Sequence, residues 1–225
     1  MNETDYGLTF FGNSVAAETT LEELEAYLTV VDKFLKKMAS SRDYKARALS
    51  LESNSDNDFD GVFPDILYSS FITAVVSFFE RELRDFADCL REASSSSIGV
   101  GDLSGSWLER FRKYCEKVAH LSLGVDKIEW ENIKGVIEVR NCMVHTGGSL
   151  FDFQGRATIE AFLRRHKLVL LESYLLNADL KLSHCVLEIV KKFIEHIYKA
   201  ADNKYPHRPS PKRSKSITSH DLFDK

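Results

Sequence analysis

Apolar and polar residues alternate along most of the chain with the spacing of amphipathic helices. The first such pattern follows Thr20, whose hydroxyl suits a helix start, and it can continue past Ser40 toward Leu49. Its apolar positions are Leu21, Leu24, Leu28, Val31 and Leu35. The acidic, polar stretch 53–60 then predicts a loop.

A second helix is predicted from Pro64, which fits a first helical turn, to about Ala93. It has two apolar stripes, which indicates a central helix or one that a second subunit covers. Further helices are expected over about 105–121, from near Asp126 to the glycines 147 and 148, over 156–167 and after Ser183. The stretch 168–183 is ambiguous, because Asn177-Ala178-Asp179 can turn a small β-hairpin. The expected fold class is all-α, a helical bundle with that hairpin before the last helix as an option.

This pattern divides the chain into three parts. Residues 1–19 are expected to form an N-terminal extension, 20–201 a helical domain, and 202–225 a disordered basic tail. The basic residues of the tail could bind nucleic acid or an acidic partner, although a plain disordered terminus is the simpler interpretation. They are Lys204, Arg208, Lys212, Arg213 and Lys215.

Charge and composition narrow the classes of function. The 225 residues carry a net charge of -4, so the whole molecule is no basic clamp for nucleic acid and any such contact needs a local patch. The four cysteines are far apart and form no zinc-ligand grouping, which favours reduced thiols, a cytoplasmic location, no metal and no cofactor. The start lacks a signal-peptide pattern and no apolar run reaches membrane length, so neither secretion nor a membrane contact is expected.

One polar constellation interrupts the apolar face of the helix after Asp126. Ile133, Val136, Ile137 and Val144 are predicted to share a stripe, and three polar residues fall within it or beside it. These are Arg140, Asn141 and His145. Burying them without partners would be unfavourable, which points to a polar cleft or a subunit interface.

These side chains suit phosphodiester cleavage. Imidazole can take the proton of a ribose 2′-hydroxyl or give one to the leaving oxygen. Arginine presents donors that match a phosphate, and asparagine can bond a phosphate oxygen or orient the imidazole. Because RNA supplies the nucleophile, this chemistry requires no metal. Common nucleotide-loop, zinc-protease and serine-hydrolase motifs are absent from the sequence.

The stretch Arg140-Asn141-x-x-x-His145 resembles the R-x4-6-H signature of the HEPN superfamily, and the apolar second helix with FFERELRDF resembles a HEPN helix. The resemblance implies an all-α bundle that dimerises, so that two such motifs build one metal-independent endoribonuclease site. Arg140 and His145 would be the catalytic pair and Asn141 an auxiliary residue. Active members often belong to toxin–antitoxin or anti-phage systems, which implies RNA as substrate and an antitoxin or defence protein as partner.

Other interpretations stand beside this one. Cations near a helix C-terminus are stabilised by about 0.3–1 kcal/mol, so Arg140 and His145 can be purely structural. The protein would then be a non-catalytic HEPN interaction module, the partner subunit of a defence or toxin system, or a ligand-sensing domain. Cys142, Trp107 and Trp130 are interpreted as packing residues, and 164–167 as a solvated basic run that could steer RNA. Glu80, Arg81 and Glu82 could line a cleft, but helix-surface pairs are the simpler expectation for them.

Overall fold

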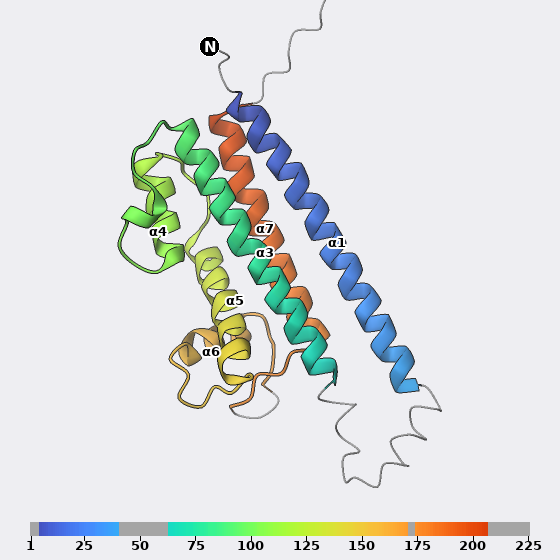
Figure 1. The fold of residues 1–225 in the computed structure, drawn as a ribbon. Helices are drawn as coiled ribbons and strands as arrows, with labels where there is room; N and C mark the ends of the chain where they lie inside the picture. The colour runs from blue at the N-terminus through green and yellow to red at the C-terminus, as the bar shows by residue number, and fades with distance from the viewer. Residues whose placement is uncertain (1–4, 41–62, 171–173, 207–225) are drawn as a thin grey trace, which may run out of the picture.

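The computed structural model describes residues 5–40, 63–170 and 174–206 (Figure 1). Within these ranges the chain forms six α-helices and no β-strand, so the predicted all-α class is confirmed. The α-helices are α1 (Tyr6–Ser40), α3 (Phe63–Ala93), α4 (Trp107–Lys113), α5 (Lys127–Thr146), α6 (Arg156–Arg165) and α7 (Leu180–Lys204). A short 3-10 helix, η2 (Val100–Asp102), precedes α4, and a π-helical segment, η3 (Tyr114–Val118), follows it. None of the helices in these ranges has the length and apolar character needed to cross a membrane.

Three long helices, α1, α3 and α7, pack side by side along most of their length (Figure 1). The helix α5 packs against α3 and α7 on the side away from α1, and α6 packs against α5. This arrangement makes α3 central, as its two apolar stripes predict. Among the described residues, the other helices leave one face of α5 and the outer face of α1 uncovered, on opposite sides of the bundle.

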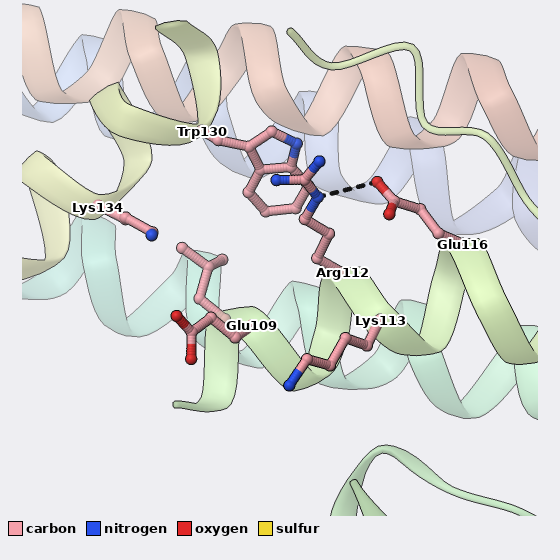
Figure 2. Close-up of a pocket in the computed structure, with 7 residues that line it drawn as sticks. Glu109, Arg112, Lys113, Glu116, Trp130 and Lys134 are labelled. Carbon is pink, nitrogen blue, oxygen red and sulfur yellow. Dashed lines mark hydrogen bonds and ion pairs between the residues drawn. The ribbon is translucent and has the colours of Figure 1, made fainter. Parts of the chain in front are cut away.

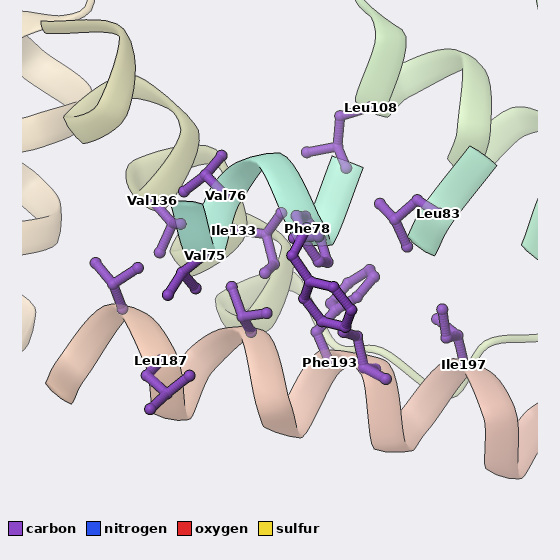
Figure 3. Close-up of a cluster of buried hydrophobic side chains, with 14 of the residues drawn as sticks. Val75, Val76, Phe78, Leu83, Leu108, Ile133, Val136, Leu187, Phe193 and Ile197 are labelled. Atoms are coloured by element: carbon purple, nitrogen blue, oxygen red, sulfur yellow. The ribbon is translucent and has the colours of Figure 1, made fainter. Parts of the chain in front are cut away.

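The core joins α3, α5 and α7 through aliphatic and aromatic side chains (Figure 3). Phe193 of α7 lies at its centre, where its ring meets Phe79 edge-on at 5.6 Å and Trp130 at 5.1 Å between centroids. Such edge-to-face pairs stabilise a core beyond the area that they bury. Trp130 is therefore a packing residue, as predicted.

Several helix boundaries follow from local capping. Pro64 lies in the first turn of α3, which ends at Ala93 as predicted. Asp126 caps α5, since its carboxylate accepts the Glu129 backbone N–H at 2.8 Å. Gly147 ends α5 in the left-handed conformation at φ 60°, which glycine adopts without strain.

The predicted start of the first helix is wrong. The helix begins at Tyr6, and the Thr20 hydroxyl donates to the backbone oxygen of Ala16 within it. The first turn is capped by Asp5, whose carboxylate accepts the backbone N–H three residues on. Phe10 and Ala17, expected outside the helical domain, are buried in the core. Their burial extends the helix beyond the point where local signals place its start.

The optional β-hairpin before the last helix does not form among the residues described around it. Asp179 caps α7 by accepting the Leu182 backbone N–H at 2.7 Å, so it begins a helix rather than completing a turn. Leu175 instead forms an isolated bridge with Ser149. Ser183, predicted to cap the last helix, lies inside α7 and is fully buried.

The third predicted helix is shorter than expected, because its regular part ends at Lys113 and its π-helical continuation ends at Val118. The last helix is longer than expected and reaches Lys204. The predicted loop 53–60, the continuation toward Leu49 and the tail from residue 207 lie outside the described residues.

Candidate functional site

The predicted motif lies on the last two turns of α5. The buried face of this helix contains different residues there from those of the predicted apolar stripe. Val139 and Cys142 are fully buried, whereas Val144 is 52% exposed. The predicted stripe is therefore wrong at its C-terminal end. Arg140 consequently lies at the border of the buried face rather than in its middle.

Arg140 is held between α5 and α3 by an ion pair with Glu80, and 19% of its side chain is exposed. The contact uses the Nη2 nitrogen of Arg140 and Oε1 of Glu80. The Nε atom is buried and has no hydrogen-bond partner among the described residues. The other terminal nitrogen, Nη1, also makes no hydrogen bond there, so the guanidinium keeps unused donor capacity.

Asn141 and His145 lie one turn apart on the neighbouring row of α5. Asn141 is half-buried and His145 is exposed in the last turn. Within the described part of the chain, neither forms a hydrogen bond, and none joins the three motif residues to one another. The structure thus places all three on one end of one helix, with the imidazole facing solvent.

Glu80 is the residue near this motif that the sequence interpretation missed as a partner. Its predicted role was a helix-surface pair within α3, which is wrong because its carboxylate pairs with α5. Glu82 also turns inward and accepts a hydrogen bond from the Tyr198 hydroxyl of α7. The sequence contains one signal for this contact, because Glu80 directly follows the buried Phe79 and therefore lies at the edge of the buried face of α3. Which residue of α5 it meets depends on how α3 is rotated about its axis against α5.

Cys142 is a packing residue, as predicted. Its thiol is buried and lies 3.4 Å from the Thr146 hydroxyl. Burial raises the pKa of the Cys142 thiol above its usual value, which opposes thiolate formation. Cys142 is therefore no candidate nucleophile.

A hollow near α5 lies away from the motif, between α4 and the first half of α5 (Figure 2). It has a volume of about 330 Å³, and Leu108 and Trp130 form its apolar wall. The Arg112 guanidinium lies over the Trp130 ring at 5.2 Å and donates to Glu116 at 2.9 Å. Its remaining lining residues are Glu109, Lys113 and Lys134. The charges are mixed, so the hollow has no marked preference for an anion.

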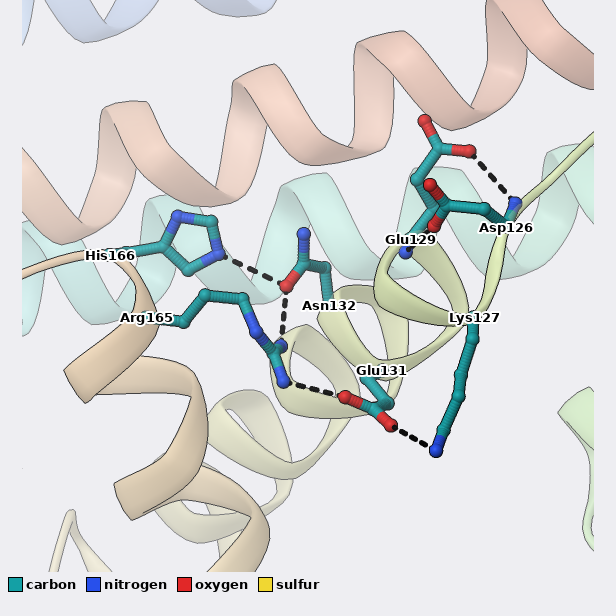
Figure 4. A network of polar contacts seen from close by, with 7 residues as sticks. All are labelled: Asp126, Lys127, Glu129, Glu131, Asn132, Arg165 and His166. Carbon is teal, nitrogen blue, oxygen red and sulfur yellow. Dashed lines mark hydrogen bonds and ion pairs between the residues drawn. The ribbon is translucent and has the colours of Figure 1, made fainter.

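The basic run 164–167 is partly engaged in contacts within the protein (Figure 4). Arg165 donates to Glu131 at 2.7 Å and to Asn132 at 2.6 Å, and His166 lies 3.2 Å from the same Asn132 oxygen. Burial, and then the neighbouring Arg165, lowers the pKa of His166 below its usual value. These contacts tie α6 to α5. Arg164, Arg165 and Lys167 are the exposed cations of the run, and Arg165 is the one of them that pairs with α5.

Among residues 5–40, 63–170 and 174–206 there is no cluster of three or more His, Cys, Asp or Glu side chains able to hold a metal ion. Fold and site together define the class only as an all-α helical bundle with an Arg-Asn-His group at the end of α5. The chain matches no family model, no curated protein and no solved structure at a significant level.

Proposed function

We propose that the protein is a metal-independent endoribonuclease of the HEPN type, acting as a symmetric homodimer in the cytoplasm. Arg140 and His145 would be its catalytic residues and Asn141 an auxiliary one. The observation that carries the proposal is the end of α5, where an exposed imidazole and a partly accessible guanidinium flank the exposed apolar Val144. Phe151, just beyond the helix, is 70% exposed as well.

Exposed apolar side chains beside polar reactive groups are what a subunit contact would cover. A second copy placed against this end of α5 would bring two Arg140 and two His145 side chains around one groove. The resulting site would carry two imidazoles, one to accept a proton and one to donate a proton.

The cleavage step follows from this arrangement. One His145 takes the proton of the ribose 2′-hydroxyl as the 2′-oxygen bonds to phosphorus. The bond from phosphorus to the 5′-oxygen breaks, and the second copy's His145, in its protonated form, gives that oxygen a proton. Arg140 stabilises the charge on the phosphoryl oxygens through the donors that Glu80 leaves unused. The products are a 2′,3′-cyclic phosphate and a 5′-hydroxyl.

The test is cleavage of total RNA and growth on induced expression of wild type, His145→Ala and Arg140→Ala. We expect wild type to cleave RNA with EDTA present and to leave cyclic phosphate ends, and both variants to lose roughly a hundredfold or more of the activity. His184→Ala, which changes an exposed histidine of α7, should retain full activity. Equal cleavage by wild type and both motif variants would remove the catalytic assignment.

A second candidate is a non-catalytic HEPN module that serves as the partner subunit of a toxin–antitoxin or anti-phage system. Two observations favour it: Glu80 already partly neutralises Arg140, and the hollow of Figure 2 contains none of the motif residues. It predicts that wild type leaves RNA intact and growth unchanged, and that it forms a stable complex with a distinct protein.

A further inference from the structure

The outer face of α1 carries an unusual number of exposed apolar side chains. Single exposed apolar residues are ordinary on a protein surface, but two rows of three, each at i, i+3 and i+7 spacing, form apolar surfaces that a partner would cover. Their exposures lie between 46% and 63%, in two groups near the two ends of the helix. The first group is Leu8, Phe11 and Val15, and the second is Tyr27, Val30 and Phe34.

Acidic residues separate the two apolar groups. Four glutamates lie between positions 18 and 25, and α1 has no lysine or arginine from Tyr6 to Val31. Glu18, Glu22 and Glu23 are exposed, and none of them forms an ion pair with another described residue. Along the helix, the outer side is therefore apolar, then strongly acidic, then apolar, with the second apolar group turned about 100° around the helix axis from the first.

The chain after α7 starts beside the beginning of this face. The Tyr205 ring stacks on Phe10 of α1, with 5.6 Å between centroids, and α7 ends next to the start of α1 (Figure 1). The following residues, 207–225, lie outside the described part of the chain. Their sequence has four bases and no acid from 207 to 216, followed by Ile217, Leu222 and Phe223.

We propose that residues 207–225 bind along the outer face of α1. The bases at 208–215 lie beside the glutamates at 18–25, and the apolar residues that follow cover Tyr27, Val30 and Phe34. Residues 207–225 are basic first and apolar afterwards, and α1, from its glutamates onward, is acidic first and apolar afterwards, so the two segments match in this order. From Phe10 to Phe34 the helix spans about 36 Å, and the 12 residue-to-residue steps from Tyr205 to Ile217 can reach about 40 Å when extended.

A second copy of α1 fits the same face less well. In an antiparallel pair centred near Leu21, each apolar group would meet the opposite group of the other copy. The same register would bring Glu18 close to the second copy's Glu23, twice. Like charges facing each other are unfavourable, whereas the basic segment is attracted to them.

The experiment is zero-length carbodiimide cross-linking of the dilute full-length chain, with the joined peptides read by mass spectrometry. We expect amide links from Lys212 or Lys215 to the glutamates at 18–25, reduced at high salt. The pairs Lys192–Glu129, at 2.6 Å, and Lys36–Asp32, at 2.7 Å, are internal standards that must also react. Reaction of these standards without any link between the segment and α1 would overturn the proposal.

Charge variants test the attraction while leaving reactive groups in place. Arg208→Glu with Arg213→Glu removes the net charge of the segment but keeps both lysines, and should lower the yield roughly tenfold. Glu22→Gln with Glu25→Gln should lower the yield of links at the remaining Glu18 and Glu23, whereas Glu188→Gln with Glu195→Gln, the same charge change on exposed positions of α7, should not.

Mixing the chain with an isotope-labelled copy shows whether the outer face of α1 binds the segment of its own chain or a second copy. Links confined to single-isotope pairs support binding within one chain. Mixed-isotope links between the segment and α1, or between two α1 helices, would show that a second copy occupies the face and would overturn the proposal. This outcome is independent of RNA cleavage, which the same preparations can report separately.

Discussion

Arg140 and Glu80 lie 60 residues apart in the chain, yet they form the ion pair that fixes the motif arginine. Because 19% of the Arg140 side chain and 32% of the Glu80 side chain are exposed, the pair is neither a free surface contact nor a fully buried one. In the proposed enzyme, Glu80 is a positioning residue that directs the guanidinium along α3. The same contact reduces the charge that Arg140 offers to a phosphate.

Glu80→Ala should lower the free energy of unfolding by about 1–2 kcal/mol, between the values for exposed and buried pairs. Chemical denaturation measures the change, and a double-mutant cycle with Arg140→Ala isolates the pair. Lys36→Ala, which removes the 71% exposed lysine from its pair with Asp32, should cost less than about 1 kcal/mol. Additive effects of Glu80→Ala and Arg140→Ala would mean that the two residues do not interact.

Glu82 is a second inward-facing acid of α3, bound to the Tyr198 hydroxyl of α7. Burial raises the pKa of Glu82, although the Tyr198 hydrogen bond acts in the opposite direction. Because its folded pKa lies above its unfolded pKa, the neutral form stabilises the fold. That contribution is complete below the ordinary glutamate pKa and is lost as pH rises through the raised value.

Glu82→Gln keeps an oxygen that accepts from Tyr198 and removes the charge. We expect its stability relative to wild type to increase as pH rises above the ordinary glutamate pKa, because only wild type must bury a carboxylate there. Thermal melts across this pH range measure the difference. Glu188→Gln, at an exposed site of α7, should show no such trend, and a flat difference for Glu82→Gln would contradict the assignment.

At the scale of elements, α6 lies close to α5 because α5 carries glycine at position 135. A Cβ atom there would lie 2.5 Å from Cδ2 and 2.7 Å from Cβ of Phe162. The second atom is next to the backbone, so a change of rotamer would not relieve the overlap. Glycine inside a helix is otherwise unfavourable, so the close packing gives a physical reason for it here.

Gly135→Ala should therefore destabilise the protein by about 1–2 kcal/mol, because overpacking outweighs the gain in helix propensity. Gly12→Ala, inside α1 with no atom within 4 Å of the new Cβ, should instead stabilise it by about 0.5–1 kcal/mol. Urea denaturation of the pair measures both signs. A stabilising Gly135→Ala would show that α6 can move away from α5 at little cost.

At the scale of the whole molecule, the bundle presents its two candidate interaction surfaces on opposite sides. The end of α5 carries the Arg-Asn-His group and Val144, and the outer face of α1 carries the apolar and acidic patch. A homodimer formed through α5 leaves the α1 face free for the chain's own basic segment. The two proposals therefore do not compete for surface.

Val144→Lys should weaken the proposed dimer at least tenfold without unfolding the subunit, because it places a charge in the expected contact. Analytical ultracentrifugation over a dilution series measures the dissociation constant. Val169→Lys, at a site that is 86% exposed outside the helices, is the matched control and should leave the constant unchanged. An equal effect of both substitutions, or none, would place the contact elsewhere.

Much of the helical layout could be predicted because its signals are local. Pro64, Asp126 and Gly147 act through the backbone groups of their own helix ends, and each lies where the sequence places it. The all-α class follows from the spacing of apolar residues in the same way. Thr20 and Ser183 were wrongly predicted to begin helices, because residues that can cap a helix also occur inside helices. In both cases, burial of neighbouring residues extends the helix past them.

The sequence by itself determined the helical class, several helix ends and the position of Arg140, Asn141 and His145 on one helix. Only the tertiary structure decided that Arg140 pairs with Glu80, that Val144 faces outward and that α1 begins at Tyr6. The physical reason is range: caps and periodicity depend on neighbours within about one turn. The rotation of a helix about its axis depends instead on how side chains distant in sequence pack together.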